Sequence, residues 1–155
     1  MQTTSLPTCL QPNNSKTQPV QPIQNVQKFN VNYELLGCKQ VGSEVVCKLK
    51  ITSVGEDDDI FIYGLSNGET VIWDAETGSE YYPTTVKIGD KVGEAATYKK
   101  LIANFPVATE INFGNVNTKI SNISKLVING GTKAHQGDFY DRRFKIEMRN
   151  IVVSH

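Results

Sequence analysis

Apolar and polar residues alternate with a period of two through most of the chain after residue 27, and short clusters of Gly, Asn and Asp interrupt the alternation. A period of two places successive side chains on opposite faces of a β-strand, and the clusters are typical of turns. The segment 98–104 is the one stretch that could form a helix, and it is too short to change the fold class. The alternation predicts strands over 29–35, 45–51, 59–65, 70–73, 80–88, 107–113, 123–128 and 144–148.

Seven or eight short strands separated by turns predict an all-β fold. The expected architecture is an immunoglobulin-like sandwich of two antiparallel sheets, and a β-barrel is the alternative. About 128 residues take part, which is enough to bury roughly two-thirds of the surface of the unfolded chain.

The first 27 residues lack any apolar period. They hold four of the six prolines, six glutamines and a single charged side chain, Lys16. Such a composition buries too little apolar surface to offset the entropy lost on ordering. We therefore expect a disordered or polyproline-like linker over 1–26 that contributes nothing to folding, followed by one β-sandwich domain over 27–155.

The segment CKQVGSEVVC, residues 38–47, predicts a β-hairpin closed by a disulfide. If Gly42 and Ser43 form a two-residue type II′ turn, Val41 faces Glu44 and the register brings Cys38 opposite Cys47. This pair falls at a non-hydrogen-bonded position, where Cα atoms lie about 4.5 Å apart, a separation that a disulfide accepts. The alternative is a pair of reduced thiols packed as small apolar groups.

The alternation also changes phase within the first strand. Phe29 to Leu35 share one face at every second residue, whereas Leu36 and Cys38 share the other. A β-bulge between Leu35 and Gly37 reconciles the two sets, with Leu36 then expected opposite Leu49 and Tyr33 opposite Ile51.

Three segments together resemble a group of uncharacterised immunoglobulin-like bacterial domains: the Cys-bounded hairpin, the strand pair VVCKLKITSVGEDDDIFIY and the closing RFKIEMRNIVV. These domains occur on secreted proteins, lipoproteins and envelope-associated proteins, often in cyanobacteria. The resemblance spans about residues 28–153 and implies a non-catalytic, extracytoplasmic sandwich with no family-wide ligand or active site. Location in the periplasm, on the cell surface or outside the cell assumes an export signal upstream of this chain.

Charge and motifs restrict the function classes. Sixteen Lys and Arg balance sixteen Asp and Glu, so no overall field favours nucleic acid, and no apolar run has the length of a membrane helix. His135 and His155, the two histidines, lie in no recognisable Ser, Cys or metal arrangement, and a zinc site with Cys9 would have the wrong spacing. Cys9 is interpreted as an exposed linker thiol rather than a lipidated residue. We expect no enzyme activity and no cofactor, with Ca²⁺ as the one metal considered.

Two sets of residues are candidate binding sites. Asp57, Asp58 and Asp59 supply hard oxygen ligands of the kind that Ca²⁺ takes, although a solvated turn is the simpler interpretation. The aromatic residues Trp73, Tyr82, Phe139 and Tyr140 form a candidate platform for sugar rings or a partner protein.

The preferred interpretation of Trp73 is structural. We expect Asp74–Gly78 to form a turn, with Trp73 in the core on the same face as Val71 and beside Tyr81. The leading hypothesis is therefore a non-enzymatic module that binds a protein or a cell-envelope component from a flexible tether. The alternative is a carbohydrate-binding module, assisted by Ca²⁺ or not.

Overall fold

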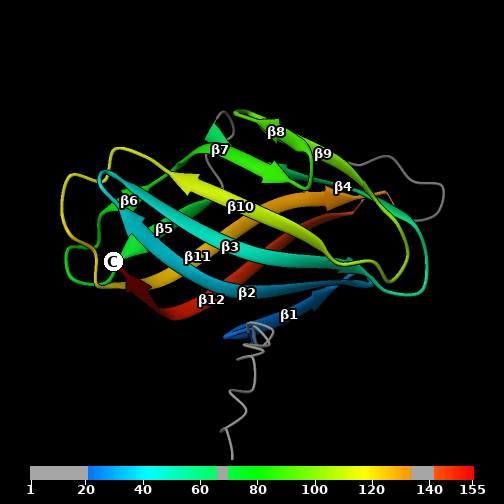
Figure 1. Cartoon of the computed structure of the whole chain (residues 1–155), viewed down its shortest axis with the longest axis horizontal. Helices are drawn as coiled ribbons and strands as arrows, with labels where there is room; N and C mark the ends of the chain where they lie inside the picture. The colour runs from blue at the N-terminus through cyan, green and yellow to red at the C-terminus, as the bar shows by residue number, and fades with distance from the viewer. Residues whose placement is uncertain (1–20, 66–69, 134–141) are drawn as a thin grey trace, which may run out of the picture.

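A computed structural model describes residues 21–65, 70–133 and 142–155. Within these ranges the chain forms twelve strands and no α-helix (Figure 1). The strands are β1 (Gln24–Lys28), β2 (Val31–Val41), β3 (Glu44–Ser53), β4 (Asp58–Tyr63), β5 (Val71–Asp74), β6 (Glu80–Tyr81), β7 (Pro83–Ile88), β8 (Lys91–Gly93), β9 (Ala96–Leu101), β10 (Val107–Phe113), β11 (Asn122–Thr132) and β12 (Arg143–Ser154).

Hydrogen bonds connect the strands into one curled sheet. Its main path is β6-β5-β11-β12-β2-β3-β10-β7-β8, while β1 pairs with β2 and β4 pairs with both β11 and β9. Every pairing is antiparallel except that of β12 with β2, which is parallel over Val153 to Cys38 and Ser154 to Lys39. One wall consists of β2, β3, β10, β7 and β8, and the wall behind it consists of β4, β5, β9, β11 and β12 (Figure 1).

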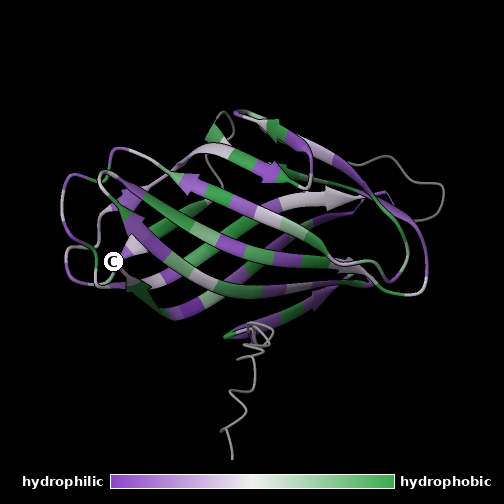
Figure 2. Cartoon of the chain, in the orientation of Figure 1, coloured by the Kyte–Doolittle hydropathy of each residue, from purple (hydrophilic) through white to green (hydrophobic). Residues whose placement is uncertain are grey.

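The core lies between the two walls. Apolar and polar bands alternate along β2, β3 and β10 in Figure 2, as expected for strands with one face inside and one face in water. Across the core, the rings of Tyr33 on β2 and Phe144 on β12 lie 5.2 Å apart. The fully buried side chains from both walls include Tyr33, Leu35, Leu49, Ile51, Ile60, Ile62, Ile72, Ile88, Ile111, Phe113, Leu126 and Ile128.

Hydrogen bonds from buried polar side chains hold a loop against one wall and join the two walls at one edge. The Gln40 amide accepts a hydrogen bond from the Ile120 N–H (2.8 Å) and donates to the Thr118 carbonyl (2.9 Å), which holds the β10–β11 connection against β2. The Thr97 hydroxyl on β9 donates to the Val86 carbonyl on β7 (2.7 Å). This bond joins the walls at the edge where no backbone ladder connects them.

The all-β prediction is confirmed. The expected sandwich of two antiparallel sheets with seven or eight strands is corrected, because the twelve described strands form one curled sheet that includes a parallel pair. Two predicted boundaries also need correction. The predicted strand over 80–88 divides at Tyr82 into β6 and β7, and β1, β8 and β9 were not expected. The segment 98–104, considered as a helix, instead belongs largely to β9 because Ala96 to Leu101 pair with β4. The predicted linker also ends too late, since residues 24–26 pair with β2 in β1. The remainder of the linker prediction, residues 1–20, lies outside the described residues.

Candidate functional site

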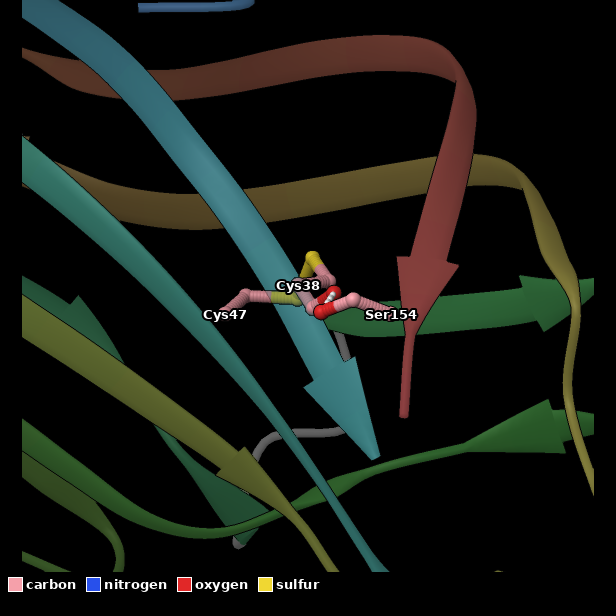
Figure 3. The surroundings of a disulfide bond; sticks show 3 residues. All are labelled: Cys38, Cys47 and Ser154. Atoms are coloured by element: carbon pink, nitrogen blue, oxygen red, sulfur yellow. Dashed lines mark hydrogen bonds between the residues drawn. A yellow bond between two sulfur atoms is a disulfide. The ribbon is translucent and has the colours of Figure 1, made fainter. Parts of the chain in front are cut away.

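The hairpin of β2 and β3 carries the disulfide that the sequence predicts. Gly42 has φ 60° and Ser43 has no positive φ, as a type II′ turn requires, and Val41 pairs with Glu44. Cys38 and Cys47 are directly opposite, with their Cα atoms 4.1 Å apart and their sulfurs bonded (Figure 3). The disulfide prediction is confirmed. Such a bond indicates an oxidising, extracytoplasmic setting.

The β-bulge lies where the phase change predicts it, between Leu35 and Gly37. Tyr33 faces Ile51 as expected, but Leu35 rather than Leu36 faces Leu49. Leu36 is the extra residue, so its side chain leaves the core and is only half-buried. The predicted pairing of Leu36 with Leu49 is therefore wrong, because it requires the inserted residue to be Leu35, one position before the observed one.

Trp73 lies on the outer face of its wall, contrary to the expectation of a core position. Ile72 is the fully buried residue of β5 and pairs with Tyr81, which packs against the core, whereas Trp73 pairs with Glu80. The period-two alternation of β5 therefore favours Ile72 over Trp73 for the inside. The predicted turn Asp74–Gly78 is confirmed by a hydrogen bond from the Gly78 N–H to the Asp74 carbonyl (2.9 Å).

Two of the four candidate aromatic residues meet on one carboxylate. The Trp73 indole N–H donates to Glu80 Oε1 (2.9 Å), and the Tyr82 hydroxyl donates to Glu80 Oε2 (2.7 Å). The Lys125 ammonium lies 4.3 Å from the centre of the Trp73 ring. These four side chains, from β5, β6, β11 and the residue between β6 and β7, form an outer aromatic cluster. Phe139 and Tyr140 lie outside the described residues.

The hydrogen bonds of this cluster shift two pKa values. Donation from Tyr82 and then from Trp73 lowers the pKa of the Glu80 carboxyl. The same bond to Glu80 raises the pKa of the Tyr82 phenol above 10.0. The cluster thus presents an ionised carboxylate and a protonated phenol side by side on the surface.

The candidate Ca²⁺ ligands Asp57, Asp58 and Asp59 form no metal site in the described structure. The Asp57 carboxylate accepts the Ala103 N–H (2.9 Å), and Asp58, which is buried, accepts the Lys133 N–H (3.1 Å). Burial raises the pKa of the Asp58 carboxyl, against the lowering effect of its backbone hydrogen bonds. In the described parts of the chain, no three His, Cys, Asp or Glu side chains gather as metal ligands. The Asp57 and Asp58 carboxylates instead bind loop backbone, and Asp59 accepts the Lys133 N–H through its backbone carbonyl (2.9 Å).

Exposed apolar residues that were not predicted from the sequence lie in three turns, which meet at the end of the molecule on the right of Figure 1. They are Phe29, Val54, Ile102 and Phe105, with 39%, 45%, 48% and 66% of each residue exposed. We refer to these four residues as the apolar tip. All four lie in the turns β1–β2, β3–β4 and β9–β10, so the signal that could have revealed them is bulky apolar residues within turn sequences.

Hydrogen bonds hold the three turns of the apolar tip together. The Val54 N–H donates to the Asn30 carbonyl and the Asn104 N–H to the Ser53 carbonyl, both at 2.7 Å, and the Gly55 N–H donates to Asn104 Oδ1 at 2.9 Å. Phe29 has φ 49°, a left-handed conformation that is rare for a bulky residue. The hydrogen bonds therefore fix the three turns relative to one another, and the left-handed backbone of Phe29 costs conformational free energy.

Comparison with known protein families finds no family model that matches the chain, and none of the curated proteins is similar to it in sequence. Among the residues described, no helix has the length and apolar character needed to cross a membrane.

Proposed function

We propose that this protein is a non-enzymatic, extracytoplasmic β-sandwich module of the immunoglobulin-like kind that binds a protein or another component of the cell envelope. The single observation that carries the proposal is the apolar tip. Monomeric proteins expose isolated apolar side chains freely, but four bulky ones on three joined turns are typical of an interaction surface.

The disulfide supports the extracytoplasmic part of the proposal. Structural disulfides persist in oxidising compartments and are rare where thiols are kept reduced. The Cys38–Cys47 bond is buried, with 3% and 0% of the two residues exposed, so it is placed to stabilise the domain rather than to react with other thiols. The family resemblance carried by the hairpin and the closing strand agrees with this location.

The apolar tip is suited to binding because it is fixed before a partner arrives. Loops held by hydrogen bonds lose little conformational entropy on association, so more of the contact energy remains as affinity. Phe29 is also fixed by its own turn, because a two-residue type I′ hairpin requires a positive φ at both Phe29 and Asn30.

A pair of matched double variants tests this proposal. The tip variant carries Ile102→Ser and Phe105→Ser, and the control carries Val92→Ser and Val152→Ser, which lie 63% and 72% exposed on β8 and β12. We expect the wild type and the control to cosediment with a cell-envelope fraction and the tip variant to remain in solution. Thermal melting checks that both variants are folded. Equal retention of all three proteins, or of none, would contradict the proposal.

A second candidate function, carbohydrate binding, is favoured by the outer aromatic cluster. Trp73 offers a ring face and Glu80 a hydrogen-bonding carboxylate, which together suit the apolar and hydroxyl-bearing sides of a sugar. A glycan array, read with and without EDTA, would compare Tyr82→Ala with the control Tyr98→Ala, an exposed tyrosine of β9. Glycan binding that is lost only in Tyr82→Ala would favour this function over the tip-based one.

A further inference from the structure

A hollow on the outer face of β2, β3 and β10 is separate from both surfaces described above. It has a volume of about 510 Å³ and lies beside the disulfide hairpin, near the end of β12. In Figure 3, Ser154 at the end of β12 approaches Cys38, whose carbonyl accepts a hydrogen bond from the Ser154 hydroxyl (3.4 Å). This end of β12 forms one border of the hollow.

The hollow lies where Gly37, which has no side chain, occupies one position in a row of paired residues across β2, β3 and β10. Gly37 on β2 faces Lys48 on β3, which faces Glu110 on β10. A Cβ atom built on Gly37 would meet no other atom within 4 Å. The bulge thus places a glycine where the regular outer face would carry a side chain, and the space remains open.

The lining combines an apolar floor with an excess of positive charge. Leu36, Val41 and Val46 contribute the apolar part, and the charged side chains are Lys39, Lys48 and Glu110. The Lys48 ammonium lies 3.6 Å from the Glu110 carboxylate. Within the described ranges, no carboxylate lies within 4.0 Å of the Lys39 ammonium. The Lys39 ammonium is therefore the one positive charge of the lining that no described carboxylate balances, and it lies beside an apolar surface.

We propose that this hollow binds a small amphiphilic anion, namely an apolar chain that carries a single carboxylate. The chain lies on Leu36, Val41 and Val46, and the carboxylate accepts hydrogen bonds from the Lys39 ammonium. The excess positive charge selects an anion, and the apolar floor selects a ligand with a hydrocarbon body. The volume falls in the range of small-molecule sites, roughly 300–1,000 Å³.

Decanoate is the test ligand. Decanol, which has the hydrocarbon chain without the charge, and acetate, which has the charge without the chain, are the comparison ligands. Binding to the full chain is followed by titration calorimetry and by NMR shifts of backbone amides. We expect decanoate to bind saturably and to shift amides of β2, β3 and β10, while acetate and decanol bind at least about tenfold more weakly. Acetate lacks the hydrocarbon contact, and decanol lacks the charge that pairs with Lys39.

Two variants with matched controls locate the site. Lys39→Gln should lower the affinity for decanoate about tenfold and leave decanol unchanged, because only the ionic contact is lost. Val46→Asp should lower the affinity for both ligands. Lys145→Gln and Val92→Asp make the same changes at exposed positions of β12 and β8 and should have no effect.

Several results would overturn the proposal. Acetate binding as tightly as decanoate would show a simple ion site, and decanol binding as tightly would show an apolar groove without anion recognition. Decanoate shifts confined to the apolar tip would move the ligand elsewhere. If Val46→Asp instead converts a dimer into a monomer, the hollow is an interface between copies of the chain. An unchanged Kd in both Lys39→Gln and Val46→Asp would also exclude this site.

Discussion

Reduction of the Cys38–Cys47 bond should destabilise the domain by an amount that follows from the length of the loop it closes. The bond joins residues nine apart and so closes a loop of ten residues. The chain-entropy model gives about 2.7 kcal/mol for such a loop at 25 °C. Because reduction keeps both sulfur atoms in the core, it adds almost no cavity term, unlike substitution by alanine. For a domain whose total stability is roughly 5–15 kcal/mol, this loss is large.

The assay compares urea unfolding of the oxidised and the reduced protein. Because both sulfurs are buried, reduction is carried out on unfolded chains that then refold under reducing conditions. We expect a midpoint shift equivalent to about 2.7 kcal/mol and a fall in melting temperature of roughly 10 °C. A Cys9→Ser chain treated in parallel excludes any contribution of the third thiol, and the intact mass confirms the loss of two hydrogens on oxidation. Unfolding free energies that agree within about 0.5 kcal/mol would refute the reasoning, since extrapolation alone carries an uncertainty of that size.

Three further predictions concern titration and chain boundaries. Burial raises the pKa of Asp58 in the folded state, so its contribution to stability falls as pH rises from about 3.9 through the folded pKa. Asp58→Asn should therefore remove that part of the pH dependence measured by urea unfolding, whereas the control Asp57→Asn should retain it. Glu80→Gln should bring the pKa of the Tyr82 phenol back toward 10.0. Absorbance titration follows phenolate formation, and subtracting the curve of the matching Tyr82→Phe variant isolates the signal of Tyr82. An unchanged Tyr82 titration would argue against the hydrogen bond to Glu80. A chain that begins at residue 21 should melt like the full chain, whereas one that begins at residue 29 lacks β1 and should be less stable by at least about 1 kcal/mol; equal melting of both would mean that β1 adds nothing.

Local patterns explain which parts of the fold could be predicted. The register of the disulfide hairpin depends only on a two-residue turn and on counting outward from Gly42, so one sequence segment was sufficient. The bulge also followed from a local phase change, although its inserted residue could not be placed to within one position. The strand β1 was missed because QNVQK has no alternation, and it is ordered by pairing with β2 rather than by its own composition.

The surfaces were harder to predict than the strands. The core position of Trp73 was predicted from the face that it shares with Val71 and from Tyr81 across the turn. The face of so short a strand depends on its neighbours, however, and Ile72 lies inside. The apolar tip requires knowledge of which turns meet at one end, and the hollow requires knowledge that β10 lies beside the β2–β3 hairpin, from which it is distant in sequence. Such proximity is a property of the tertiary fold, so alternation along the chain does not contain it.

The parallel contact between β12 and β2 has a consequence for the order of folding. Because Val153 and Ser154 pair with Cys38 and Lys39, the backbone ladder that joins the two walls forms only after nearly the whole domain has been synthesised. The β2–β3 hairpin needs no residue beyond 53 and can close its disulfide long before that. The folding chain would thus pass through a stage in which the β2–β3 hairpin is already closed by its disulfide while β12 has not yet paired with β2. Timed thiol trapping of chains truncated after residue 113 tests this: formation of the Cys38–Cys47 bond at the full-length rate is expected, and a bond that waits for β12 would exclude it.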